Sequence, residues 1–145
     1  MLRSLRPYLI LPLLLLPLAC GKKGSSALVP VSGRVMLNNQ PLAHANIRFQ
    51  PERQAGDKDT PESYGETDEQ GYFTLKPIGK EWEGSEGAVV GKHFVQISKY
   101  DRTLGKDGLV RGEQVPYQYN RDSTLTFPVP PDGTKEANFL DLKGK

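Results

Sequence analysis

Only a few side chains in this sequence have chemistry that points to a covalent, metal-binding or ligand-binding role. Cys20 is the sole cysteine, and a single cysteine cannot form an intrachain disulfide, so its presence needs another explanation. His44 and His93 are the two histidines, and they form no His-x-His or His-x3-His pair. We therefore predict that both histidines pack in the fold or lie on its surface, and that the protein holds no metal.

The sequence gives no support for a catalytic site. It contains no Gly-x-Ser-x-Gly elbow for a nucleophilic serine. The spacing of Asp57, Asp59, Asp68 and Glu69 does not match an EF-hand calcium loop. An aspartate in a tight turn, such as Asp68, usually accepts hydrogen bonds from the local backbone. We predict no catalytic residue and no cofactor.

Two aromatic residues are candidates for contact with a ligand. Trp82 is the sole tryptophan and stands between Glu81 and Glu83 in a polar segment, while Tyr117 is followed closely by Tyr119. An exposed aromatic ring can stack on a sugar or anchor a protein contact. Alternatively, Trp82 folds back to cap the edge of the domain, because large aromatic side chains seldom stay fully exposed. Of the two tyrosines, we expect Tyr119 to be the more buried.

The N-terminus has the organisation of a secretory signal. Arg3 and Arg6 form a short positive region, and an apolar run follows over residues 8–18. That run is well short of the roughly 20 residues that a membrane-spanning helix needs. We predict a signal peptide over residues 1–19 and export of the remaining chain.

The residues at the end of this signal resemble the lipobox of bacterial lipoproteins. Leu18-Ala19-Cys20 matches the end of that motif, whereas Pro17 stands where Leu, Val or Ile is usual. The resemblance implies cleavage before Cys20, lipidation of Cys20, and an anchor of several acyl chains in the cell membrane or the outer membrane. The alternative is an ordinary signal peptide with an incidental cysteine. Residues 20–30 are small and polar, and we expect a flexible tether there.

The charge of the exported chain argues against a nucleic-acid partner. Of the 19 basic residues, Arg3 and Arg6 lie in the segment that we expect to be removed, which leaves 17 basic against 17 acidic residues. A chain with this balance has no strongly basic surface for phosphate groups.

Residues 31–143 are predicted to form one all-β domain, because apolar and polar residues alternate there in short runs that are separated by glycines and prolines, of which the whole chain has 15 and 12. We expect a hairpin of 64–67 with 72–75 around the turn Asp68–Gly71, and a surface loop over 50–63. The alternation does not decide which face of the last strand points into the core, because Phe139 lies on one face and Leu140 and Leu142 lie on the other. The fold class is an antiparallel β-sandwich of about seven strands, transthyretin-like or immunoglobulin-like. Its predicted strands lie at 31–37, 45–50, 64–67, 72–75, 93–99, 125–129 and 138–142.

Four segments along the chain match a known pattern, namely residues 31–35 with 40–45, residues 67–73, residues 91–97, and residues 115–120 with 123–125. In this order they resemble the carboxypeptidase regulatory-like domain, a transthyretin-like sandwich, as found in small bacterial lipoproteins. The resemblance implies a fold and an accessory role, and no reaction of its own. Two enzyme types share the transthyretin-like topology. Intradiol dioxygenases need closely spaced histidines, and hydroxyisourate hydrolases end in Tyr-Arg-Gly-Ser, whereas this chain has neither feature.

These observations predict a non-catalytic binding or scaffolding lipoprotein of the cell envelope. Its expected partners are the membrane, through Cys20, and an envelope protein or a glycan. The alternative function is a carbohydrate-binding module that uses Trp82 and Tyr117, and a transthyretin-like enzyme such as a hydrolase is the least favoured.

Overall fold

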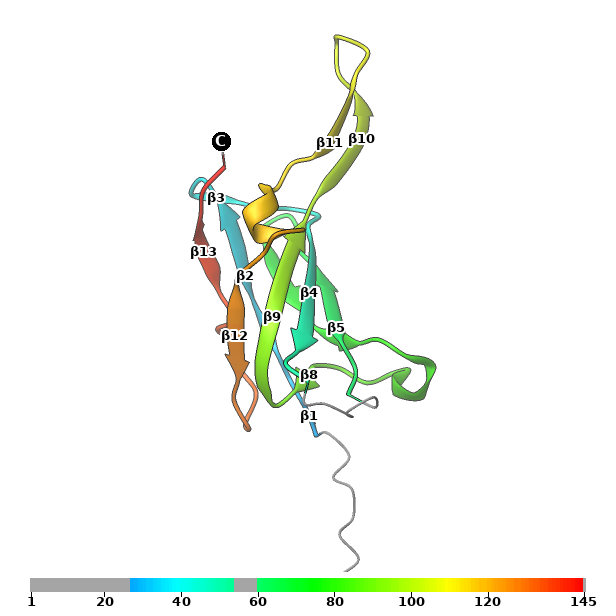
Figure 1. The fold of residues 1–145 in the computed structure, drawn as a ribbon, viewed down its shortest axis with the longest axis vertical. Coiled ribbons are helices and arrows are strands. Elements are labelled where there is room, and N and C mark those ends of the chain that lie inside the picture. The colour runs from blue at the N-terminus through cyan, green and yellow to red at the C-terminus, as the bar shows by residue number, and fades with distance from the viewer. Residues whose placement is uncertain (1–26, 54–59, 145) are drawn as a thin grey trace, which may run out of the picture.

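The computed structural model describes residues 27–53 and 60–144, and their strands form a sandwich of two main sheets (Figure 1). The all-β sandwich predicted from the sequence is therefore confirmed. The predicted signal peptide, Cys20 and the first part of the tether lie outside the described residues. One sheet has the strand order β12 (Thr126–Val129), β9 (Gly91–Ser98), β4 (Asn46–Pro51), β5 (Ser63–Glu66) and β7 (Lys76–Pro77). The other has the order β13 (Phe139–Leu142), β2 (Ser32–Leu37) and β3 (Gln40–Pro41), and β6 (Tyr72–Thr74) also pairs with β2.

Each of the seven segments predicted as a strand contains a strand, but one pairing departs from the antiparallel pattern. β13 runs parallel to β2, with a register shift between Phe139 and Leu142. This irregularity places both Phe139 and Leu142 in the core and leaves Leu140 41% exposed. A strict period of two allows only one of these phases, so the register shift explains why the sequence left the phase of this strand open.

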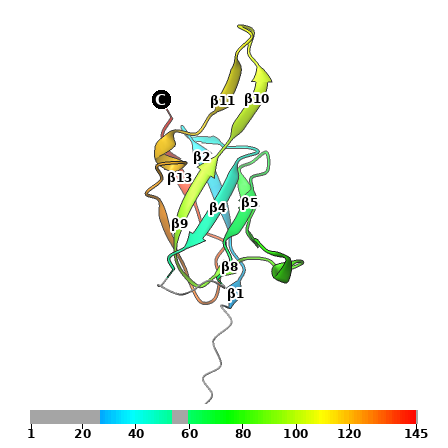
Figure 2. The same cartoon turned by 45° about the vertical axis from the view of Figure 1, so that its right-hand side comes forward.

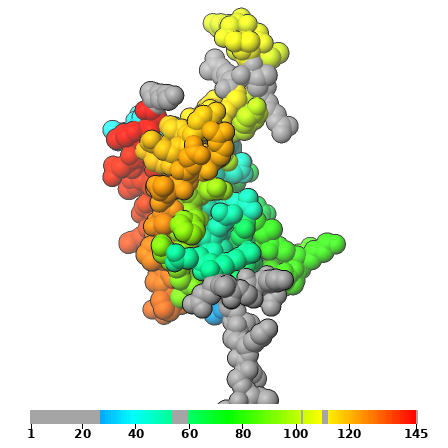
Figure 3. Space-filling view, in the orientation of Figure 1, coloured from blue at the N-terminus to red at the C-terminus, as the bar shows by residue number. Residues whose placement is uncertain are grey.

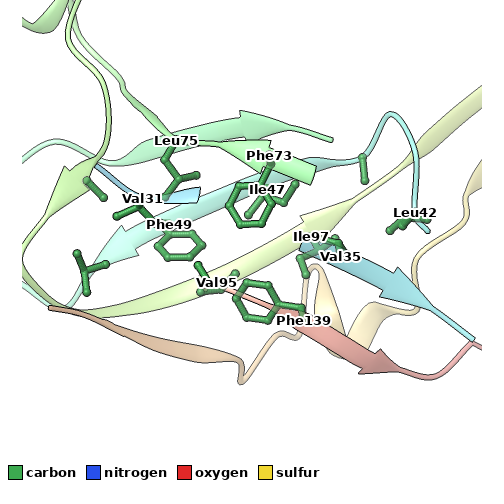
Figure 4. Close-up of a cluster of buried hydrophobic side chains, with 14 of the residues drawn as sticks. Val31, Val35, Leu42, Ile47, Phe49, Phe73, Leu75, Val95, Ile97 and Phe139 are labelled. Atoms are coloured by element: carbon green, nitrogen blue, oxygen red, sulfur yellow. The ribbon is translucent and has the colours of Figure 1, made fainter. Parts of the chain in front are cut away.

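The core lies between the two sheets and follows the predicted alternation (Figure 4). Val35 from β2, Ile47 and Phe49 from β4, and Val95 and Ile97 from β9 are fully buried. Alternate residues of a strand point to the same face, so each strand contributes one apolar row to the interior.

Phe49 lies at the centre of an aromatic cluster within this core. Its ring centroid is 5.8 Å from that of Phe127, 6.2 Å from Phe139 and 6.5 Å from Phe73. The rings are tilted or edge-on, as aromatic pairs prefer. Because Phe73 and Phe139 belong to the second sheet, these contacts join the two layers.

The predicted hairpin of residues 64–67 with 72–75 is wrong. β5 pairs with β4 and β7, whereas β6 pairs with β2 in the opposite sheet. The turn itself forms, and Asp68 Oδ1 accepts hydrogen bonds from the backbone N–H of Gln70 and Tyr72 at 2.9 Å each. The segment is therefore a corner that carries the chain from one sheet to the other.

Contacts with other parts of the chain fix this corner. The buried Thr67 hydroxyl donates to the Leu42 carbonyl at 2.5 Å and accepts from the Ala45 N–H at 2.8 Å. Gly71 has φ +82°, and a Cβ there would lie 2.5 Å from the carbonyl oxygen of Val35. The Thr67 contacts hold the start of the corner against the segment between β3 and β4, and Gly71 allows its end to pass close to β2. A hairpin would instead return the chain along β5.

Two small sheets lie at opposite ends of the sandwich (Figures 1 and 2). At one end β1 (Leu28–Val29) pairs with β8 (Ala88–Val89). The ordered domain thus begins before residue 31, because Val29 is buried against the core. At the other end β10 (Tyr100–Leu104) and β11 (Val110–Glu113) form a hairpin that projects beyond both sheets. Two short 3-10 helices, η1 (Lys80–Trp82) and η2 (Tyr117–Tyr119), complete the described elements.

The described part of the chain contains no helix with the length and apolar character that crossing a bilayer requires.

Candidate functional site

The two aromatic candidates, Trp82 and Tyr117, lie in separate grooves. Trp82 ends η1, on a segment that projects from the side of the domain (green in Figure 3), and its side chain is partly buried. Tyr117 begins η2, near the base of the β10–β11 hairpin, and is 58% exposed. The two grooves share no lining residue. The structure therefore does not bring these residues into one site.

The groove at Trp82 combines the indole with charged side chains and has a volume of about 480 Å³. The partial burial of the Trp82 side chain lies between the two outcomes that the sequence left open, a fully exposed ring and a buried cap. The other lining residues come from β4, from the segment before β5 and from the segment around η1. They are Arg48, Arg53, Thr60, Pro61, Glu62, Ile78 and Glu81.

The groove at Tyr117 is smaller, about 320 Å³, and is partly apolar. Leu37, Val115 and Pro116 line it beside the tyrosine. The Arg121 guanidinium carbon lies 4.6 Å from the centre of the Tyr117 ring, which is a cation–π arrangement.

Tyr119, on the same 3-10 helix, packs against the core. Its hydroxyl accepts a hydrogen bond from the Lys143 N–H at 3.1 Å. The prediction that Tyr119 is the more buried of the two tyrosines is confirmed.

The β10–β11 hairpin is a feature that the sequence reasoning missed. Tyr100, Leu104 and Leu109 are 62%, 69% and 68% exposed, so most of each apolar side chain faces solvent. The turn signal was present in the sequence as Asp107-Gly108: Gly108 has φ +77°, and Asp107 Oδ1 accepts the Leu109 N–H at 3.1 Å. A register shift within the hairpin interrupts the period-two alternation, which hid its strands.

Glu113 fastens the base of this hairpin to the sandwich. Its Oε1 accepts hydrogen bonds from the backbone N–H of Lys99 at 2.8 Å and of Val115 at 2.9 Å. Its Oε2 accepts one from the Asn120 side-chain amide at 2.6 Å. Hydrogen bonds to an ionised carboxylate are stronger than neutral ones, so Glu113 fixes the direction in which the hairpin leaves the domain.

The two histidines lie at opposite ends of β4. His44 occupies the exposed turn before this strand, with φ +53°, and its Nδ1 is 3.6 Å from Glu66 Oε1. His93 pairs with Pro51 at the far end of the strand and is fully buried. Within residues 27–53 and 60–144, no group of three or more His, Cys, Asp or Glu side chains could hold a metal ion.

Burial of His93 has an electrostatic consequence. Loss of hydration disfavours the imidazolium and lowers the pKa of His93 below 6.5, while its hydrogen bond to the Gly91 carbonyl acts in the opposite direction. The Nδ1 to oxygen distance is 2.9 Å, so the neutral ring donates from Nδ1. Nε2 has no hydrogen-bond partner among the described residues, and the ring lies 5.7 Å from that of Phe49. His93 is therefore a neutral core residue.

Comparison with known proteins adds little information about what this geometry does. No family model matches the sequence, and no curated protein matches it. Among solved structures, a 9R-lipoxygenase from Cyanothece PCC8801 has 16% sequence identity and a TM-score of 0.34, over 80% of this chain and 16% of that chain. A match of this quality says nothing about activity, and the likeness to the carboxypeptidase regulatory-like domain stays a prediction.

Proposed function

We propose that the protein is a lipid-anchored, non-catalytic binding module of the bacterial cell envelope, and that the β10–β11 hairpin contacts a partner protein. The observation that carries this proposal is the position of the hairpin at the end of the domain opposite β1 (Figures 1 and 2). Because only a short segment separates Cys20 from β1, a lipid on Cys20 holds the β1 end closest to the membrane. The hairpin then points away from the bilayer.

The surface of the hairpin supports a role in protein contact. Tyr100, Leu104 and Leu109 leave most of their apolar surface in water. Apolar side chains gathered on one projecting element are typical of interaction sites, and an isolated two-stranded hairpin is only marginally stable. Binding of a partner would bury these side chains, while the Glu113 contacts keep the hairpin oriented.

Polar side chains that form hydrogen bonds within the fold support the non-catalytic part of the proposal. Asp68 holds the turn of the corner, Thr67 bonds the corner to the segment between β3 and β4, and Glu113 holds the base of the hairpin. Each of these groups is committed to hydrogen bonds with the backbone.

Site-specific photo-crosslinking in intact cells tests this proposal. A photo-crosslinking amino acid is placed at Leu104 or Leu109 on the hairpin, and at Val90 or Leu140 on the sandwich as matched controls, since each of these is 41% exposed. We expect a discrete crosslinked product from the hairpin positions and none from the controls. Cys20→Ala should lower the yield of that product, because the chain then has no acyl chains to anchor it. Equal crosslinking from all four positions, or none from the hairpin, contradicts the proposal.

A further inference from the structure

The groove at Trp82 lies on a different part of the molecule from the hairpin, and its lining points to a second binding activity. One wall is polar and comes from β4 and the segment before β5, and the other is formed by η1 and the residues just before it. Its volume of about 480 Å³ falls within the range of small-molecule sites.

The polar wall is held in place by its own hydrogen bonds. Arg48 contacts Glu62 Oε2 through two nitrogens, with Nε at 2.7 Å. The Gln50 side-chain amide donates to Glu62 Oε1 at 3.3 Å, and Arg53 Nη2 donates to the Thr60 carbonyl at 3.2 Å. These groups are already oriented, so a ligand that binds them does not have to order them.

The aromatic wall is tied to the polar wall through the backbone. The Ile78 N–H donates to the Glu62 carbonyl at 2.7 Å, which joins the start of this segment to the residue that organises the other wall. The backbone N–H of Trp82 donates to the Gly79 carbonyl at 3.1 Å, and the Trp82 carbonyl accepts the backbone N–H of Ser85 at 2.9 Å. The indole is therefore carried on a defined turn and not on a free loop.

The charges of the groove select the class of ligand. Arg48 and Arg53 are balanced by Glu62 and Glu81, so the lining has no net formal charge. An anionic ligand would meet two carboxylates and a cationic ligand would meet two guanidinium groups, and each would be opposed by like charges. A neutral ligand with several hydroxyl groups can donate to the carboxylates and accept from the guanidinium groups at once.

We propose that the groove formed by Trp82, Arg48, Arg53, Glu62 and Glu81 binds a neutral carbohydrate. The C–H face of a sugar ring lies on the electron-rich face of the indole, while the sugar hydroxyls bond to the Arg48–Glu62 pair. This site acts independently of the hairpin, because Trp82 and the hairpin residues belong to separate parts of the surface.

Trp82 is the only tryptophan in the sequence, so its fluorescence reports on this groove alone. The full chain, purified from membranes in detergent, is titrated with maltohexaose, cellohexaose and hexa-N-acetylchitohexaose, and with oligogalacturonate as an anionic comparison. We expect a saturable change in Trp82 fluorescence with at least one neutral oligosaccharide and none with oligogalacturonate. No saturable change with any neutral oligosaccharide, or equal binding of oligogalacturonate, overturns the proposal.

Two variants separate binding in the groove from other effects. Arg48→Met keeps the fluorophore and removes the bonds to sugar hydroxyls, so we expect at least about tenfold weaker binding. Arg121→Met is the matched control, since Arg121 is also an exposed arginine beside a carboxylate, that of Asp122, but lies near Tyr117, and it should bind as the parent chain does. Equal affinities of the two variants would refute the assignment. The crosslinks from Leu104 and Leu109 are scored separately, so either proposal can fail without the other.

Discussion

His93 is a buried histidine in a core that is otherwise almost entirely apolar. It is fully buried, its ring contacts Phe49, and it is held in the neutral form because burial lowers its pKa below 6.5. In the unfolded chain the same imidazole takes up a proton near pH 6.5. Between that pH and the lowered pKa of the folded state, the unfolded chain binds more protons, so acidification lowers the free energy of unfolding.

We therefore predict that the protein loses stability as the pH falls from about 7 to about 5, and that His93→Phe removes that loss. Urea denaturation at several pH values across this range measures the slope for each chain. The free energies of unfolding at different pH values are compared within each variant, so the result does not depend on any change in absolute stability that the larger ring causes. Val95→Ala is the control, because Val95 is buried on the same strand as His93 and its replacement removes no titratable group, so this variant should keep the slope of the parent. An unchanged slope in His93→Phe would contradict this account of His93.

Side chains that act on their immediate neighbours could be predicted from the sequence. Asp68 bonds to its own turn, as its residue type and local pattern indicated. For His93 the sequence left core packing and surface exposure open, and the structure places it in the core. Glu113 could not be predicted, because its partners include Lys99 and Asn120 and the geometry depends on how the hairpin meets η2. The same holds for the groove at Trp82. Arg48 and Glu62 meet there only because β4 pairs with β5.

At the scale of elements, the corner between β5 and β6 determines how the two sheets are connected. A turn with Asp and Gly is typical of a hairpin, and the local residues alone favour that interpretation. The difference comes from contacts distant in sequence: the Thr67 hydroxyl bonds to Leu42 and Ala45, and the Gly71 carbonyl accepts the Val35 N–H at 2.9 Å. Alternation of apolar residues predicts which side of a strand is buried, but it does not say which strand is the neighbour.

Substitution of Gly71 tests the importance of this corner. Gly71→Ala introduces a Cβ 2.5 Å from the Val35 carbonyl oxygen, and we expect the free energy of unfolding to fall by about 3 kcal/mol. Gly84→Ala is a matched control, because Gly84 also has φ +82° but has nothing within 4 Å of the Cβ position. It should cost about 1 kcal/mol, the effect of the backbone conformation alone. Equal losses for the two variants in urea denaturation would show that contact with β2 does not constrain the corner.

At the scale of the whole molecule, the elements at the two ends of the sandwich determine the orientation that we propose at the membrane. The described chain begins beside β1, and the β10–β11 hairpin lies at the opposite end of the sandwich (Figure 1). The proposed anchor on Cys20 would turn this arrangement into an orientation, with the hairpin facing away from the membrane. The groove at Trp82 lies on the side of the domain, on a part of the surface that is separate from the hairpin.

This arrangement could be predicted only in part. The positions of the strands along the chain and their buried faces follow from the alternation in the sequence, which explains why the all-β sandwich could be predicted. The hairpin was missed because its apolar side chains are exposed and its register is shifted, so it lacks the pattern of a half-buried strand.

The lipid on Cys20 is the central claim, since the orientation of the hairpin depends on it. Intact-mass spectrometry of the protein purified from the membrane fraction tests it directly. We predict a mature chain that begins at Cys20 and carries the added mass of its acyl chains, and we predict that Cys20→Ala is neither lipidated nor cleaved at that position. A mature chain that begins at another residue, or one with an unmodified Cys20, would contradict the account.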